Sequence, residues 1–425
     1  MSLPRKVCVI DGSRIPFCRS GGKYLGVTNQ ELMSTALKGL VEKLNLKGKV
    51  LGEVSLGAVV KHTADFNLAR ESSLDAGLAF ETPAYDLQRA CGTGLEAAIN
   101  VANKIAMGQI ECGIAGGCDT NSEVPIEFKK AFSDRLMKMN YAKTTLDKVK
   151  ALAGLVPSDL LPKIPGVREP RTGLSMGESC ELMAKEWKLT QKDQDELAMI
   201  SHKNAEKAYL DNFYSDLVIP FKGITKDNNV RGDSSIEKLS KLKPAFDRTS
   251  GQGTMTAGNS TPLTDGASAV FLCSEEYAQK NGLKVKAYLT HGQAAAVNFV
   301  SGEGLLMAPA YAVPVMLDRA GLKLQDFDFY EIHEAFAAQV LCTLKAWESE
   351  DFCRNKLKRA EALGSIDRSK MNIKGGSLAL GHPFAATGGR IVASLAKMID
   401  ENQGGRGLIS ICTAGGMGVT AILEK

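Results

Sequence analysis

The sequence predicts an α/β fold made of two similar halves, the first of which carries a long insertion. Short apolar runs alternate with helical patterns in the first and last thirds of the chain, which is typical of a mainly parallel sheet covered by helices. A weak internal repeat indicates the two halves, because an Ala-Gly-Gly run closes a strand after a helix at 115–117 and again at 414–416. Between the halves, residues 124–252 interrupt the rhythm with many Lys, Asp, Asn and Pro residues.

The elements of the first third follow from hydrophobic periodicity. Apolar residues recur every three or four positions in the predicted helices and run continuously through the predicted strands. The expected strands cover residues 6–11, 54–60, 84–87 and 112–116, and the expected helices cover residues 30–43 and 94–107.

The insertion and the last third complete the predicted order. A helix is expected over 191–209, with Thr190 as its N-cap. The later strands are expected at 267–272, 327–332, 372–374 and 407–412, and the later helices at 334–344 and 387–399. We therefore expect an N-terminal half at residues 1–123 and 253–275, an insertion domain at 124–252 and a C-terminal half at 276–425.

Composition excludes several classes of protein. The 425 residues carry a formal net charge of +4, which is too mild for nucleic acid as the main partner but suits an anionic small molecule. No apolar run reaches the ~18 residues of a membrane span, and residues 1–6 are too short for a secretion signal. The ten cysteines include no C-x-x-C pair, so we expect reduced thiols, a cytoplasmic location and no metal site.

The first candidate for chemistry is Cys91, which stands between the end of a strand and the start of a helix. The sequence there reads QRACGTG at 88–94. A helix N-terminus offers free N–H groups and partial positive charge, which lower the pKa of a thiol and favour the nucleophilic thiolate. Gly92 and Gly94 leave the approach open for a ligand. The alternative is a buried cysteine in a tight corner.

Two further loops carry candidate residues. His382 lies among small residues in GGSLALGHP at 375–383, where a neutral imidazole can take a proton from a nearby thiol; the alternative is a capping histidine. Cys412 ends a strand, and the TAGGMG loop after it at 413–418 has N–H groups able to hold an oxyanion. The alternative there is a core cysteine before a tight turn.

His333 and Glu334 also stand where a strand becomes a helix. We expect His333 to bind a substrate oxygen or to hold a water, whereas Glu334 is either a catalytic group or a favourable charge in the first turn of the helix. Together the four segments place two cysteines and two histidines at strand ends of two repeated units. Packing of the two halves would bring them together for covalent thioester chemistry.

Taken together, these segments resemble the thiolase family over nearly the whole chain. The shared motifs follow the family's order and spacing: the Cys91 segment, HEAFA at 333–337, GHP at 381–383, CTAGG at 412–416, RIPF at 14–17, TAGN at 256–259 and DGA at 265–267. Most thiolases carry Asn where this chain has His333. The His variant is similar to the 3-ketoacyl-CoA thiolase (acetyl-CoA acyltransferase) β subunit of fatty-acid oxidation (trifunctional) complexes, as are LKPAFD at 242–247 and GHPFAATG at 381–388.

The resemblance implies a fold, a reaction and a set of catalytic residues. The implied fold has two βαβαβαββ halves forming an αβαβα layered core. Cys91 would attack the 3-keto carbon and become acylated, with His382 as its base, and Cys412 would move protons at the leaving and entering groups. His333 would position a water at one oxyanion hole, and the backbone N–H groups of Cys91 and Ala414 would form the other, although Ala414 departs from the usual Gly.

The resemblance also implies how substrate is held. Coenzyme A would be a co-substrate, with no permanently bound cofactor, and its contacts would map to Arg231, Ala257 and Thr261, the last replacing a usual Ser. Met176 falls where the family lines its acyl pocket. The family forms dimers or tetramers, and this subgroup pairs with a hydratase–3-hydroxyacyl-CoA dehydrogenase subunit.

Other functions remain as alternatives. The same site would serve a biosynthetic acetoacetyl-CoA thiolase, which runs the reverse condensation. A ketoacyl synthase would carry His or Asn in place of Cys412. A non-catalytic lipid-binding relative would not need all of the chemical residues.

Residues 128–150 add a feature outside the active site. This segment has seven Lys or Arg residues against two Asp residues, with Phe128, Phe132, Leu136 and Met139 at helical spacing. A basic amphipathic helix of this kind can form a lid over the acyl chain, dock on a partner or lie on a membrane surface. All three interpretations stay open at this point, and the lid is favoured.

Overall fold

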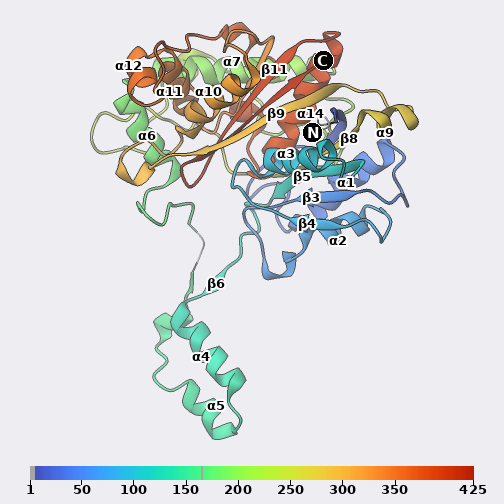
Figure 1. Ribbon diagram of the computed structural model, residues 1–425. Coiled ribbons are helices and arrows are strands. Elements are labelled where there is room, and N and C mark those ends of the chain that lie inside the picture. The colour runs from blue at the N-terminus through green and yellow to red at the C-terminus, as the bar shows by residue number, and fades with distance from the viewer. Residues whose placement is uncertain (1–4, 164–165) are drawn as a thin grey trace.

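A computed structural model describes residues 5–163 and 166–425 of the chain. A mixed sheet of ten strands runs through the body of the molecule (Figure 1). Its main path follows the order β10-β11-β12-β9-β1-β8-β5-β3-β4, and β2 pairs with β8. The strands are β1 (Val7–Arg14), β2 (Cys18–Arg19), β3 (Glu53–Leu56), β4 (Ala84–Asp86), β5 (Cys112–Asp119), β8 (Thr264–Ser274), β9 (Ala287–Ala296), β10 (Phe329–Ile332), β11 (Arg406–Thr413) and β12 (Met417–Glu424).

The expectation of a mainly parallel sheet is wrong. The strands β3, β4 and β5 pair in parallel, as do β10 and β11, but each half also has a long strand that returns antiparallel. In the first half β8 lies antiparallel between β1 and β5, and in the second half β12 lies antiparallel between β11 and β9. The short turn after Thr413 permits only a hairpin, which is why β11 and β12 run in opposite directions.

Two helices, α3 (Thr93–Ala106) and α14 (Ala386–Glu401), lie between the two halves of the sheet. They touch backbone to backbone, because a Cβ added at Gly388 would lie 2.0 Å from the amide nitrogen of Leu95. One core cluster joins these helices to strands of both halves, and two outer clusters lie against the covering helices. The result is the αβαβα layering that the resemblance implies.

The covering helices differ between the halves. The first half is covered by α1 (Asn29–Lys43) and α2 (Leu68–Asp75), and the second by α6 (Met176–Glu186), α10 (Ala308–Ala320) and α11 (Ala337–Glu348) (Figure 1). The remaining elements are α4 (Lys130–Tyr141), α5 (Thr145–Ala151), α7 (Gln191–Leu210), α8 (Ile236–Leu239), α9 (Glu275–Lys280), α12 (Glu350–Asn355), α13 (Ser377–Leu380), β6 (Glu127–Phe128) and β7 (Pro162–Lys163).

Most predicted elements occur within a few residues of their expected bounds. Thr190 caps α7 as predicted, because its hydroxyl accepts from the Asp193 amide and the Asp193 carboxylate accepts from the Thr190 amide. Two predictions are wrong. Residues 372–374 form no strand, and Met371 alone bridges to Tyr330. The helix expected from 334 begins at Ala337, because the carboxylate of Glu334 is held by tertiary hydrogen bonds instead.

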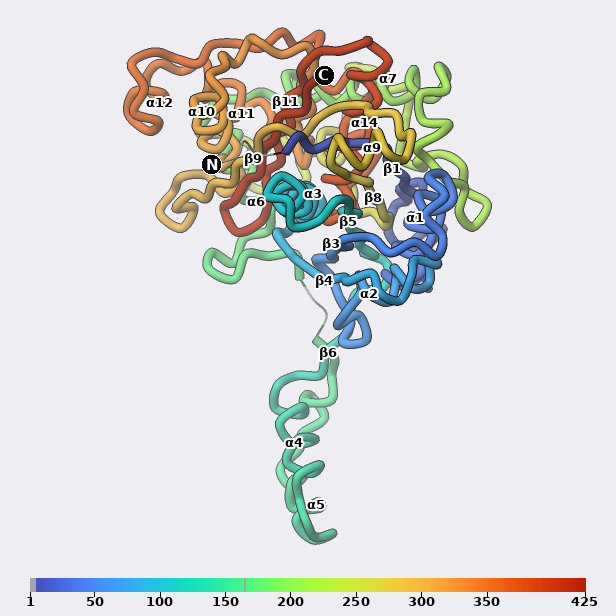
Figure 2. The backbone as a smooth tube through the Cα atoms, turned by 45° about the vertical axis from the view of Figure 1, so that its right-hand side comes forward, coloured from blue at the N-terminus to red at the C-terminus, as the bar shows by residue number. Residues whose placement is uncertain are grey.

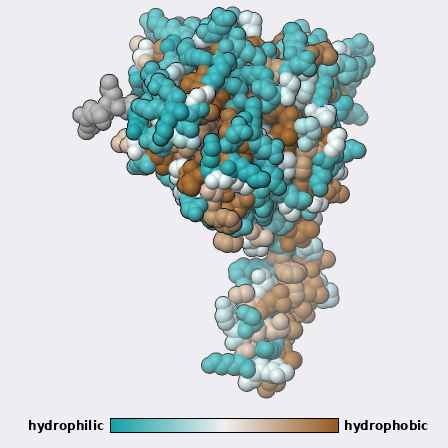
Figure 3. Space-filling view, turned by 90° about the vertical axis from the view of Figure 1, so that its right-hand side faces the viewer, coloured by the Kyte–Doolittle hydropathy of each residue, from teal (hydrophilic) through white to brown (hydrophobic). Residues whose placement is uncertain are grey.

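Residues 127–163 form an arm that stands away from the body (Figures 1 and 2). The strands β6 and β7 make its neck, and α4 and α5 make a hairpin, so the single basic helix expected over 128–150 is in fact two. None of these residues lines the cavity that contains Cys91, so the arm does not have the position of a lid. Hydrophobic side chains, including Met137, Tyr141 and Val149, are exposed along it (Figure 3).

No helix among the described residues is long and apolar enough to cross a bilayer. Residues 1–4 of the N-terminal segment, on which the expectation about secretion rests, lie outside the described residues, and so do residues 164 and 165 of the insertion.

Candidate active site

The structure brings Cys91, His382 and Cys412 to one cavity of about 210 Å³. The three residues come from the N-terminal side of α3, the loop before α14 and the end of β11, which are far apart in the chain. The rest of the wall is mostly apolar, with Met176, Val167, Leu263, Leu306, Phe246, Phe336 and Phe384 among its side chains. Such a wall excludes water and leaves few polar groups to face a ligand.

Cys91 is presented by a sharp turn between β4 and α3. The residue before it, Ala90, has a φ of 44°, a left-handed conformation that is strained for alanine. The turn is held by Thr93, whose hydroxyl donates to the Ala90 carbonyl over 2.7 Å and accepts from the Arg89 amide over 2.8 Å. The cysteine is thereby placed just ahead of the helix, partly open to the cavity.

The expectation that the helix lowers the pKa of Cys91 is wrong. Burial raises the pKa of the Cys91 thiol to about 12, although the backbone N–H groups of Ala414 and of Cys91 itself donate toward the sulfur and act in the opposite direction. Two N–H dipoles do not offset the removal of a thiolate from water. At rest Cys91 is therefore a neutral thiol, and an attack by its sulfur would require the loss of its proton.

His382 lies in a tightly fixed loop. Gly381 has a φ of 101°, and the His382 amide donates to Thr264 Oγ1 over 2.7 Å. Its Nδ1 is 2.6 Å from Thr387 Oγ1, whereas its buried Nε2 has no hydrogen-bond partner among the described residues. Burial and the nearby Arg390 lower the pKa of His382 to about 3, so the ring is neutral and has a nitrogen available for a reacting group.

His333 packs against His382, with the ring centroids 4.1 Å apart. Its Nδ1 lies 2.9 Å from Ser377 Oγ, and its buried Nε2 has no partner within the described part of the chain. Burial, His382 and Arg390 together lower the pKa of His333 well below its ordinary value. His333 is thus also neutral. It lies beside His382 but does not itself line the cavity that contains Cys91.

The carboxylate of Glu334 is held by hydrogen bonds within the protein. Its carboxylate accepts hydrogen bonds from Ser201 Oγ, Asn372 Nδ2 and the Leu378 amide, at 2.7, 2.6 and 3.2 Å. These bonds tie β10 to α7 and to the loop that leads to His382. Glu334 does not line the cavity that contains Cys91, and it precedes the first turn of α11.

Cys412 ends β11, and the loop after it approaches the nucleophile. Burial and the proximity of Cys91 raise the pKa of Cys412 well above its ordinary value. Gly415 and Gly416 have φ values of 77° and 69°, so the chain turns sharply and directs the Ala414 amide at the Cys91 sulfur. The Gly415 amide donates to Glu169 Oε1 over 2.6 Å, which holds the loop from the side of the insertion.

The predicted substrate contacts divide between two cavities. Arg231 and Ala257 line a second cavity of about 330 Å³, which shares Pro262 with the first. Met176 lines the first cavity, as predicted for an acyl pocket. Thr261 also lines the first cavity, but its hydroxyl proton is used, because it donates to the Ser377 carbonyl over 2.8 Å.

Sequence reasoning missed several residues at these cavities. Arg19, His202, Asp233 and Lys238 line the second cavity beside Arg231. Burial lowers the pKa of His202 to about 4, so its ring is neutral, and the two arginines make the cavity cationic, since Lys238 pairs with Asp233 at 2.6 Å. Ser377 lies in the glycine-rich loop at 375–383, so the sequence pattern there could have indicated its hydroxyl. Glu169 lies in the polar insertion, where no pattern distinguishes it from other carboxylates.

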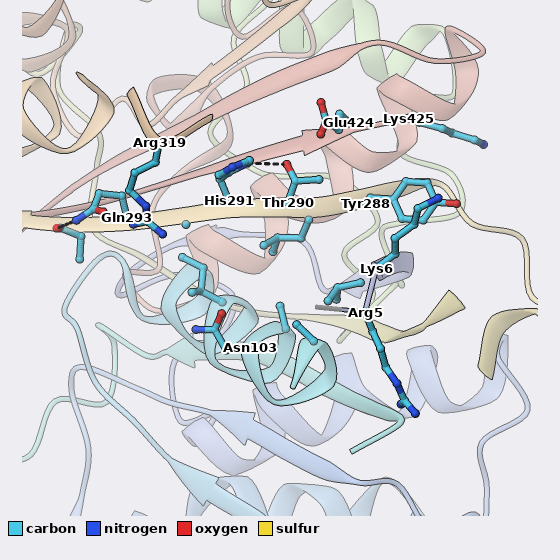
Figure 4. Close-up of a pocket in the computed structure, with 17 residues that line it drawn as sticks. Arg5, Lys6, Asn103, Tyr288, Thr290, His291, Gln293, Arg319, Glu424 and Lys425 are labelled. Carbon is cyan, nitrogen blue, oxygen red and sulfur yellow. Dashed lines mark hydrogen bonds between the residues drawn. The ribbon is translucent and has the colours of Figure 1, made fainter. Parts of the chain in front are cut away.

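A wider cleft of about 850 Å³ contains none of the predicted site residues (Figure 4). It lies between β9 and α3. Its charged groups are largely engaged elsewhere: Arg5 pairs with Glu111 at 2.6 Å, and Lys425 pairs with Asp400 at 2.8 Å. His291, with Nδ1 3.2 Å from Thr290 Oγ1, faces this cleft and has no thiol beside it.

Comparison with known proteins agrees with this geometry. The family model for the thiolase N-terminal domain matches residues 7–276, and the model for the thiolase C-terminal domain matches residues 283–425. A 3-ketoacyl-CoA thiolase of Pectobacterium carotovorum is 43% identical over 99% of this chain and 96% of its own length. A 3-ketoacyl-CoA thiolase of Vibrio cholerae is 41% identical over 99% of this chain and 97% of its own.

Solved structures give the same result. The acetyl-CoA acetyltransferase of Bacillus anthracis superposes with a TM-score of 0.83 at 29% identity, covering 100% of both chains. Human mitochondrial 3-ketoacyl-CoA thiolase superposes with a TM-score of 0.81 at 26% identity, covering 99% of both chains. With both family models matching and relatives similar along nearly their whole length, the chain belongs to the thiolase family, as its motifs predicted.

Proposed function

We propose that this chain is an acyltransferase that cleaves 3-ketoacyl-CoA with CoA, yielding acetyl-CoA and a shortened acyl-CoA in fatty-acid β-oxidation. The observation that carries the proposal is the meeting of two thiols and a neutral imidazole at one largely apolar cavity. Relatives named 3-ketoacyl-CoA thiolase, similar over nearly their whole length, support this reaction over others of the family.

In the first half-reaction the Cys91 sulfur attacks the 3-keto carbon while its proton passes to His382 Nε2. The bond between C2 and C3 then breaks, which leaves an acyl group on Cys91 and the enolate of acetyl-CoA. Cys412 donates its proton to C2 of that enolate, and acetyl-CoA leaves. Because burial raises the pKa of both thiols, each proton leaves its sulfur only as the bonds at the substrate carbons change.

In the second half-reaction CoA enters as a thiol. The Cys412 thiolate takes its proton, the CoA sulfur attacks the acyl carbon, and the bond to Cys91 breaks. The proton held by His382 returns to the Cys91 sulfur, so both cysteines and the histidine recover their first state. The Cys91 and Ala414 amides, which already point at the Cys91 sulfur, would stabilise the oxyanion formed at the attached carbonyl.

The second cavity would hold CoA. Arg19, Arg231 and Lys238 line it, and cationic side chains of this kind bind phosphate groups. The small side chain of Ala257 also lines this cavity, and Pro262 lines both cavities. In this arrangement the thiol end of CoA reaches Cys91 and the acyl chain lies against Met176 and the phenylalanines of the first cavity.

Mass spectrometry tests the proposal. Incubation with 3-ketoacyl-CoA in the absence of CoA should add one acyl group to Cys91, and CoA should then remove it as acyl-CoA. A chain that forms no adduct is not a thiolase in activity. Rates across chain lengths separate β-oxidation from the alternative of an acetoacetyl-CoA thiolase, which would accept four-carbon substrate alone.

We further propose that the enzyme works in the cytoplasm as a homo-oligomer and pairs with a hydratase–dehydrogenase subunit. The arm at 127–163 supports a docking role, because it combines exposed cationic and apolar side chains away from the cavity. Sedimentation with anionic liposomes and with the partner subunit, each repeated on a variant in which the lysines of α4 and α5 are replaced by Glu, would tell membrane contact from subunit contact.

A further inference from the structure

A chain of buried polar groups leads to His333 from behind the active site. Arg390, on α14, donates from Nη2 to Ser377 Oγ over 2.8 Å, and Ser377 Oγ lies 2.9 Å from His333 Nδ1. The exposed fractions of Arg390, Ser377 and His333 are 2%, 0% and 1%. Arg390 is held in turn by Glu331, whose carboxylate lies 3.8 Å from its Nη1.

The number of protons decides the direction of each hydrogen bond. A guanidinium only donates, so Ser377 Oγ must accept from Arg390. The hydroxyl of Ser377 has one proton, and His333 Nδ1 is its acceptor among the described residues. A buried hydroxyl without an acceptor is unfavourable, so Ser377 donates and His333 Nδ1 accepts.

The protonation of His333 follows. Its ring is buried beside His382 and Arg390, which favours the neutral form. A neutral imidazole carries one proton, and Nδ1 is occupied as an acceptor, so the proton is on Nε2. That Nε2 is buried, has no partner among the described residues, and belongs to a ring that packs on His382.

We propose that Ser377 and Arg390 are positioning residues that hold His333 in the Nε2–H tautomer. His333 then presents a hydrogen-bond donor, and not a lone pair, beside His382. Such a donor would position the water expected at one oxyanion hole, and in that respect the role rests on the proposed function. It also explains why the Ser377 hydroxyl and the buried Arg390 lie behind His333, although neither of them favours the charged form of its ring.

Nitrogen NMR reads the tautomer directly. In protein labelled with ¹⁵N-histidine, protonated and unprotonated ring nitrogens resonate far apart, and the signals of His333 are identified by their loss in His333→Asn. We expect the proton on Nε2. A proton on Nδ1 in the unaltered protein would overturn the proposal. This measurement needs no substrate, so a chain that shows the expected tautomer but no thiolysis would refute the proposed function alone.

A double-mutant cycle tests the consequence for catalysis. Ser377→Ala should mix the two tautomers in the NMR spectrum and lower kcat about ten-fold, the loss expected of one hydrogen bond, with KM for CoA little changed. In the His333→Asn background the same substitution should change kcat by less than about two-fold, because an amide has no tautomer to fix. Equal losses in both backgrounds would show a purely structural role and overturn the proposal.

A matched control is Ser55→Ala, since Ser55 is also fully buried, but on β3 and outside the cavity. It should leave the His333 signals and kcat unchanged. Should Ser377→Ala fail to fold, the tautomer of the unaltered protein still decides the question.

Discussion

The cavity around Cys91 and the cleft between β9 and α3 differ in how their polar groups are satisfied. The cleft has about four times the volume, and its charged residues are bound to partners outside it or at its edge. The smaller cavity has two thiols with raised pKa values, and beside it are two imidazole nitrogens without partners among the described residues. Volume therefore does not mark the reactive site in this molecule, whereas buried groups left available do.

The physical reason is that the two regions differ in how far they exclude water. The charged groups of the wide cleft are exposed and paired, so they have little tendency to react. In the apolar cavity, burial holds both thiols and His382 in their neutral forms, and beside the cavity it does the same for His333. Proton transfer between neutral groups requires no charge in the resting enzyme, and in the proposed mechanism the charge that develops would meet backbone N–H groups already in place.

The largest effect should come from Cys91→Ala. Removing the nucleophile should abolish acylation and lower kcat/KM at least about 10⁴-fold, measured by mass spectrometry and by loss of 3-ketoacyl-CoA. The control is Cys353→Ser, because Cys353 is fully buried, outside the cavity and bonded through sulfur to the Ala346 and Trp347 carbonyls. Full activity of Cys91→Ala would show that the reaction takes place in another part of the molecule.

His382→Gln should have the next largest effect, about 10³-fold on kcat, since the proton of Cys91 loses its acceptor. The pKa of His382 is near 3 in the folded protein, so protonation of this residue should not reduce kcat/KM between pH 7 and pH 5. A fall of kcat/KM with an apparent pKa near 6.5 that is absent in His382→Gln would contradict this assignment.

Cys412→Ala should separate the two half-reactions. Acylation of Cys91 should persist, whereas exchange of the α-protons of acetyl-CoA with solvent should fall by about 10²-fold or more, because that step needs an acid and base at C2. Exchange is followed by NMR in deuterated water. Normal exchange in this variant would remove Cys412 from the mechanism.

His333→Asn should retain some activity, with kcat lowered by about ten-fold or less. The amide can supply an N–H donor where the imidazole did. Complete loss would mean that His333 carries a proton during the reaction, and does not only donate a hydrogen bond.

The smallest effect should come from the cleft. Arg319 lines it and donates to Gln293 over 2.7 Å. Arg319→Ala should leave kcat/KM within about two-fold, as for other substitutions away from reacting groups. A large loss of thiolysis in this variant would break the contrast between the two regions.

The local patterns predicted the helices and strands that frame the site. The strand ends and helix starts beside Cys91, His382 and Cys412 lie where periodicity and small residues placed them, because those signals act over a few neighbouring residues. The arm was predicted as one helix, and it became a hairpin because Ala142 is extended and Thr144 caps a new helix through the Asp147 amide. The strand expected at 372–374 failed because Asn372 uses its side chain to bind the Ile332 backbone.

What the sequence by itself determined was the two-half organisation, the motifs and the identity of the residues that meet. Only the tertiary structure decided their chemical state. The thiol of Cys91 was expected to have a lowered pKa from its helix, and the packing of two half-sheets around it raised that pKa instead. The environment of a buried group is made by residues distant in the chain, such as Glu169, Ser377 and Arg390, and their electrostatic and solvation effects exist only once the chain has folded.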